Sequence, residues 1–397
     1  MSGLPFAAKG AHYPEMIVHR TTKTLAERAS LAAATGLFAL AAMLVPLQSC
    51  LAATFEDSDL SVRLVSESSY APQWPPDLVI AGTWPNTCLP SVLRSTLVDM
   101  HIDIELRSNG TRCADNPTPL SLKLNPARLA GLEQLALGIY EVRVFSRRAD
   151  GLSELIAFRL LRSGGDDTRS LPESGFWWSV PTTTSPALTG SGLSIEYQGD
   201  HIAVTLLSYD RGAPVWYFGS ASMSGNIARV PLARMVGGDE PFSAAGTPPV
   251  AEPGFALNLQ FLSPSHAHAW LVRAAADSSG AIETQQLDLL RLPFGSGHIG
   301  NAWRGEWALL EDESRQARIF DLDDLATADA ETFRLRDRDG HGVLQCRIEN
   351  IGGHPMPAYC TLLDDGNILA DFDHNGLDRL SGIGPDGHQV RLVRLPK

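Results

Sequence analysis

The chain has 397 residues, of which 44% are hydrophobic and 19% charged, and its formal net charge is −13. This length exceeds what one ordinary core supports and indicates two or three domains. The acidic balance argues against nucleic acid or an anionic lipid surface as a partner. The 35 Gly and 26 Pro favour many short strands joined by turns over long helices.

Residues 1–53 have the three parts of a secretory signal peptide. Basic side chains between positions 20 and 28 precede an apolar run over 31–47, and small residues follow as far as Ala53. We predict cleavage after Ala53 and a periplasmic or secreted mature chain without a transmembrane span. The alternative is a lipoprotein anchored through Cys50, because residues 47–50 (Leu-Gln-Ser-Cys) resemble a lipobox.

Four cysteines remain after Cys50, namely Cys88, Cys113, Cys346 and Cys360. An even number of cysteines in an oxidising compartment indicates disulfides. Because each predicted domain contains two of them, we expect Cys88 to pair with Cys113 and Cys346 with Cys360. A zinc site is the alternative, but no CxxC spacing supports it.

The first predicted domain covers residues 54–165. Met100, Ile102, Ile104 and Leu106 alternate with polar residues, which is typical of a half-buried antiparallel strand. About seven such strands, with turns at 109–110 and 150–151, fit an immunoglobulin-like sandwich. Residues 125–137 have room for one helical turn.

The second predicted domain covers residues 171–296 and again shows period-two alternation, in 193–197, 202–206 and 255–261. We count about eight strands. A closed antiparallel barrel would leave no strand edge exposed, so we predict a small β-barrel-like domain.

Three segments of this domain carry a resemblance: Phe176-Trp177-Trp178, the Ser-Gly-Leu of 191–193 after Gly190, and the run from Ser208 to Tyr217. Together they are similar to a WW…SGxG…YDxxGxPxW pattern in an uncharacterised family of exported proteobacterial β-proteins. The resemblance covers about residues 174–294 and departs from the pattern at 182–188. The resemblance implies export and β-structure, and it implies no activity. The layout is also similar to avidin-like barrels, as a fold analogy.

The third predicted domain covers residues 300–397 and contains some eight short strands. Asp-Gly or Asn-Gly pairs at 339–340, 365–366, 375–376 and 386–387 predict tight hairpin turns. The result is a second small antiparallel β domain, for which a barrel and a sandwich both remain open. The whole mature chain is therefore predicted to be all-β.

Aromatic side chains in the second domain are the candidate ligand-binding residues: Trp177, Trp178, Trp216 and Tyr217. Neighbouring residues of a strand point to opposite faces. We therefore expect one member of each adjacent pair to fill the core and the other to face outward. The expected partners are a small molecule, a glycan or an envelope protein.

Two weak metal patterns are present. Asp371, Asp373 and Asn375 begin a DxDxNG calcium loop, but the closing Glu is absent, so an acidic hairpin is the favoured interpretation. His266 and His268 share one face of a predicted strand, but the sequence assigns no third ligand. We predict neither a metal nor a cofactor.

Signatures of catalysis are few. Residues 295–300 match GxGxxG, but residues 301–307 read as a strand and not as the helix that a nucleotide site needs, so the segment is interpreted as a linker. The sequence favours a non-enzymatic envelope module. One alternative is a cell-wall or glycan hydrolase using paired carboxylates such as Asp371 and Asp373. The other is a barrel that binds a small apolar ligand or a sugar.

Overall fold

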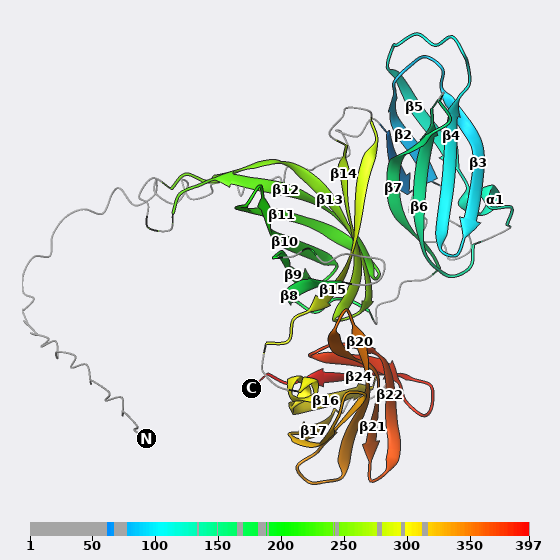
Figure 1. The fold of residues 1–397 in the computed structure, drawn as a ribbon. Coiled ribbons are helices and arrows are strands. Elements are labelled where there is room, and N and C mark those ends of the chain that lie inside the picture. Colours follow the sequence, from blue (N-terminus) through cyan, green and yellow to red (C-terminus); the bar gives the residue numbers. More distant parts are fainter. Residues whose placement is uncertain are drawn as a thin grey trace, which may run out of the picture. The chain divides into compact units, whose positions relative to one another are not determined.

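The computed structural model describes residues 62–66, 78–132, 135–148, 150–164, 170–181, 188, 190–240, 242, 246–275, 280–294, 298–311 and 317–396. The predicted signal peptide and Cys50 lie outside these residues. The described chain is all-β, as predicted, and forms the three β-assemblies of Figure 1 in chain order. Among the helices of the described residues, none combines the length and the apolar character that a membrane span requires.

The first assembly has seven strands in two sheets, of order β1-β2-β5 and β3-β4-β6-β7. Its strands are β1 (Val62–Ser66), β2 (Leu78–Trp84), β3 (Pro90–Val98), β4 (His101–Ser108), β5 (Thr118–Leu124), β6 (Gly138–Arg147) and β7 (Ser153–Ser163). The predicted helical turn is α1 (Pro126–Leu129), which the Asn125 side chain caps by accepting a hydrogen bond from the Arg128 backbone N–H.

One core joins these two sheets, with Ile80 and Leu120 on one side and Ile104 and Val142 on the other. The predicted immunoglobulin-like topology is not confirmed. Strands β4 and β6 are parallel neighbours, whereas an immunoglobulin sandwich is built from antiparallel sheets. Local alternation predicts strands, but it does not specify which strands become neighbours.

The second assembly is a closed barrel of eight antiparallel strands, in agreement with the prediction. Its strands are β8 (Gly175–Val180), β9 (Gly192–Gln198), β10 (His201–Asp210), β11 (Ala213–Ser224), β12 (Ile227–Gly237), β13 (Pro249–Ser263), β14 (His266–Ala274) and β15 (Ile282–Arg291). Closure comes from pairing of β15 with β8. The interior is filled by large side chains that include Trp177, Phe261 and Leu257.

The third assembly is one antiparallel sheet of nine strands, one more than expected, in the order β17-β16-β24-β23-β22-β21-β20-β19-β18. Its strands are β16 (Gly305–Glu311), β17 (Arg318–Leu322), β18 (Asp324–Ala328), β19 (Thr332–Arg336), β20 (Gly342–Ile351), β21 (His354–Asp364), β22 (Asn367–Asn375), β23 (Arg379–Ile383) and β24 (Gln389–Arg394). The sheet curls until β17 contacts β19 and β20, which encloses the core around Trp303 and Trp307.

All four predicted Gly turns of this assembly join consecutive strands. At 365–366, Asp365 and Gly366 both have positive φ (48° and 81°). These values are typical of the two-residue turns that match strand twist.

Both predicted disulfides are present. Cys346 and Cys360 lie directly opposite each other on β20 and β21. Cys88 and Cys113 join the segment before β3 to the segment between β4 and β5.

The segment after the GxGxxG match differs from the prediction. Residues Ile299–Trp303 form a 3₁₀ helix, η2, and the strand begins only at Gly305. His298 caps η2 through its side chain, and the buried indole of Trp303 donates a hydrogen bond to the Gly376 carbonyl (2.8 Å). This long-range contact, which a local pattern does not show, holds the turn.

Candidate binding sites on the barrel surface

Trp177 and Trp178 lie on opposite faces of β8, as the alternation predicted. Trp177 is 0% exposed, sits edge-on to Phe261 in the barrel interior (5.7 Å between ring centroids) and donates its indole N–H to the Glu173 carbonyl (3.3 Å). Trp178 is half-buried on the outer face. Trp177 is therefore a filler of the core, and Trp178 is available to a surface site.

Trp216 and Tyr217 likewise lie on opposite faces of β11. Tyr217 is half-buried and packs against Phe255, with 4.7 Å between ring centroids. Trp216 is on the outer face and is 40% exposed. The four predicted ligand residues thus do not converge on one pocket, because two belong to the packed side of the barrel wall.

The outer face of β10 and β11 carries a group of exposed apolar side chains. Leu207 lies directly opposite Trp216, and Tyr209 and Phe218 adjoin them on the same two strands. All four are at least 40% exposed. We call Leu207, Tyr209, Trp216 and Phe218 the aromatic strip. Beyond Phe218 the same face of β11 continues with exposed hydroxyl groups at positions 220 and 222.

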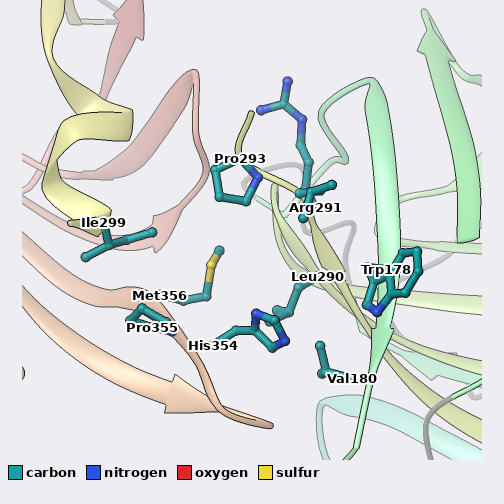
Figure 2. Close-up of a pocket in the computed structure, with 10 residues that line it drawn as sticks. Trp178, Val180, Leu290, Arg291, Pro293, Ile299, His354, Pro355 and Met356 are labelled. Carbon is teal, nitrogen blue, oxygen red and sulfur yellow. The ribbon is translucent and has the colours of Figure 1, made fainter. Parts of the chain in front are cut away.

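A second surface feature is a pocket of about 180 Å³ beside Trp178. Trp178 and Val180 lie on one side of it, Ile299 and Met356 on the other, and the His354 imidazole projects between them (Figure 2). The pocket is lined by Trp178, Val180, Leu290, Arg291, Leu292, Pro293, Ile299, His354, Pro355 and Met356. Its wall is mostly apolar, so it suits a small apolar group.

A polar cluster lies on the outer face of β14 and β15. His268 and Asp288 are directly opposite across the strand pair, and His266 is the next outward residue of β14. The potential metal-binding atoms of these three residues all lie within 4.8 Å of one another. The sequence had singled out both histidines, and strand pairing supplies the third group.

The carboxylate of Glu173 is the centre of a buried junction before β8. It accepts the backbone N–H groups of Leu377, Asp378 and Arg379 (2.7–2.9 Å), together with hydrogen bonds from Ser265 and Arg291. Gly376 lies so close that a Cβ there would be 2.2 Å from Glu173 Oε1. All these donors surround the carboxylate, so Glu173 holds the β22–β23 turn against the barrel and has no free face for a ligand.

The predicted calcium residues lie in β22, whose pairing with β23 shifts register at Asp373. Asp371 and Asp373 lie on the same face of β22, and Asp371 accepts the Thr361 hydroxyl hydrogen bond (2.7 Å). Asn375 is buried, and its side-chain amide donates to the Phe372 carbonyl (3.3 Å). Asp371 and Asn375 are held by hydrogen bonds to different neighbours, Thr361 and Phe372, so the three residues do not wrap around one point as those of a calcium loop do. The hairpin interpretation agrees with this arrangement.

Sequence reasoning missed several residues of these sites. Asp288 stands between two core leucines of β15, and a lone acid within such a run was the available signal. Leu207 and Phe218 gave no signal, because apolar residues in strands usually face a core. Glu173 precedes its strand and contacts residues more than 200 positions later.

No known protein family matches the chain, and no curated protein is similar enough in sequence to count as a relative.

Proposed function

We propose that the protein is an exported, non-enzymatic binding module of the bacterial envelope that holds a neutral glycan on the aromatic strip. The observation that carries this proposal is the exposure of four adjoining large apolar side chains on β10 and β11. Single exposed apolar residues are ordinary, whereas a contiguous group is typical of an interaction surface.

The packed interior of the barrel supports an external site. Trp177, Phe261 and their neighbours fill the space that a ligand-binding barrel of this size would keep for its ligand. The ligand is therefore held on the outer wall of the barrel and not in its interior.

The chemistry of the strip fits a sugar chain. Aromatic side chains present apolar faces to the C–H faces of sugar rings, and the Tyr209 hydroxyl group and the exposed serines at 220 and 222 supply hydrogen-bonding groups alongside. The net charge of −13 disfavours an anionic polymer. A neutral glycan is the occupant that agrees with both features.

Three features support the proposed localisation. Disulfides persist in compartments outside the cytoplasm. The pattern of residues 1–53 assigns the chain to periplasm or secretion, with attachment through Cys50 as the alternative route. The resemblance of residues 174–294 to exported proteobacterial β-proteins points the same way.

Titration with soluble β-linked hexasaccharides of glucose and of N-acetylglucosamine, followed by tryptophan fluorescence, tests the proposal. We expect saturable binding that Trp216→Ala and Phe218→Ala each weaken at least tenfold, equivalent to about 1.4 kcal/mol. Phe294→Ala removes an exposed aromatic residue outside the strip and is the control.

Unchanged affinity in Trp216→Ala would remove the strip as the binding site. Absence of glycan binding, combined with Trp216-dependent capture of a purified envelope protein, would show that the occupant is a protein and that the glycan assignment is wrong.

A further inference from the structure

Two imidazoles and one carboxylate meet on the outer wall of the barrel, away from the strands of the aromatic strip. The β14–β15 register places His268 opposite Asp288 and His266 opposite Leu290, on the same face. The backbone pairing therefore fixes all three groups before any ligand arrives, as a binding site requires.

The spacing of the three groups fits one small cation. The His268 Nε2 to Asp288 Oδ1 distance is 3.1 Å, and the His266 Nε2 to Asp288 Oδ1 distance is 3.6 Å. Zinc binds nitrogen and oxygen ligands at about 2.0–2.2 Å, so tetrahedral ligands stand roughly 3.3–3.5 Å apart. The two measured distances bracket that value.

The burial of the cluster also points to a ligand. The side chains of Asp288 and His266 are 7% and 18% exposed, and that of His268 is 34% exposed. Among the described residues, the buried Nε2 atom of His266 has no hydrogen-bond partner. A buried nitrogen without a partner is unfavourable, and a metal ion would use its lone pair.

Apolar residues surround the three groups. Trp270 follows His268 on the same face, with 6.1 Å between ring centroids, and Val180 lies opposite Asp288. An apolar surround limits water access and strengthens the binding of a cation by its ligands.

We propose that His266, His268 and Asp288 form a zinc site with three protein ligands and a fourth position for water or an exogenous ligand. Two imidazole nitrogens and one carboxylate suit Zn²⁺ and related divalent transition metals. Calcium and magnesium prefer sites made of oxygen atoms alone. The site is independent of the glycan proposal, since it uses different strands and different chemistry.

Isothermal titration calorimetry of the mature chain with Zn²⁺, after chelator treatment, tests the site. We expect one ion per chain and no comparable binding of Ca²⁺. Asp288→Asn, which keeps the shape of the side chain, and His268→Ala should each weaken Zn²⁺ binding at least about a hundredfold, since loss of an outer-shell partner alone costs 10–100-fold.

His201→Ala is the matched control, because His201 is an exposed histidine that also contacts an aspartate, Asp200, in the same barrel. Its affinity for Zn²⁺ should equal that of the wild type. Substitution of Co²⁺ should give the strong visible absorption of a tetrahedral site, and this absorption should be lost in Asp288→Asn.

Absence of saturable Zn²⁺ binding, or equal affinity in wild type and both ligand variants, would overturn the proposal. If a variant does not fold, as judged by circular dichroism, histidine NMR of the wild type decides. Zn²⁺ should then shift the signals of two imidazoles, and uniform shifts across the histidines would contradict the site.

Discussion

Glu105 is a charged residue at a buried position of β4, between the core residues Ile104 and Leu106. Its carboxylate accepts the Ser153 hydroxyl (2.6 Å) and contacts Arg94 (2.6 Å) and Arg147 (3.1 Å). The Ser153 hydrogen bond, with the two arginines, holds the pKa of Glu105 below its usual value against the opposing effect of burial. These three partners thus offset the cost of burying the Glu105 carboxylate in the sheet.

The lowered pKa of Glu105 gives a pH dependence. A depressed folded-state pKa stabilises the protein above the unfolded-state pKa of about 4.3, and this stability is lost as pH falls through the folded value. Glu105→Gln should lower the free energy of unfolding by about 2 kcal/mol at pH 7, and by less at pH 3. Urea denaturation at both pH values measures this, and an equal loss at both would contradict it.

Trp177 and Trp216 allow the stability contribution of a core tryptophan to be compared with that of a surface tryptophan. Trp177→Ala should destabilise the protein by about 3–5 kcal/mol, because it leaves a cavity in a filled barrel. Trp216→Ala should stay within about 0.5 kcal/mol of wild type, because its ring is exposed. Thermal denaturation of both variants is the measurement, and a thermally silent Trp177→Ala would show that the barrel interior is not packed as described.

At the scale of elements, the Cys346–Cys360 disulfide joins strands that are already paired. It closes a short loop across the β20–β21 hairpin, so its main effect is to restrict the unfolded chain. The hairpin lies in the middle of the nine-stranded sheet, between β19 and β22. Loss of the disulfide therefore affects the centre of that sheet.

Replacing both cysteines by serine, Cys346→Ser with Cys360→Ser, should lower the free energy of unfolding by about 3 kcal/mol. The shared transition of the barrel and the third assembly should shift to lower temperature, because the bridge lies within the third assembly and the Glu173 junction couples the two. Calorimetry with and without reductant measures this shift. A wild-type protein that is insensitive to reductant and equal in stability to the double variant would contradict the expectation.

At the scale of the whole molecule, Glu173 joins the barrel to the third assembly. Its five hydrogen bonds come from both, and an ion pair between Arg291 and Asp378 (2.8 Å) lies beside them. Three consecutive backbone N–H groups directed at one carboxylate make a strong anion-binding turn. This junction makes the two assemblies depend on each other.

Glu173→Ala leaves these donors buried without an acceptor, and we expect a loss of about 3–5 kcal/mol. Barrel and third assembly should then unfold in separate calorimetric transitions. Glu196→Gln, at an exposed acid of β9, is the control and should behave as wild type. A single unshifted transition in Glu173→Ala would show that other contacts hold the two assemblies together.

Local patterns in the sequence determined much of this fold. Period-two alternation predicted the strands and that the members of each adjacent pair, Trp177 with Trp178 and Trp216 with Tyr217, point to opposite faces. Asp-Gly and Asn-Gly pairs predicted the four hairpin connections, and at Gly340, Gly366 and Gly387 the glycine has the positive φ that such tight turns favour. Cysteine number and position predicted both disulfides. Each of these features depends on residues that are near one another in the chain.

The tertiary structure alone decided the features that join distant residues. Strand order made β4 and β6 parallel neighbours and gave the third assembly one curled sheet. Barrel formation exposed Leu207 beside Trp216 and brought Asp288 to the two histidines, and folding placed Glu173 against Leu377. These contacts depend on which strands become neighbours, and alternation along one strand carries no information about that choice.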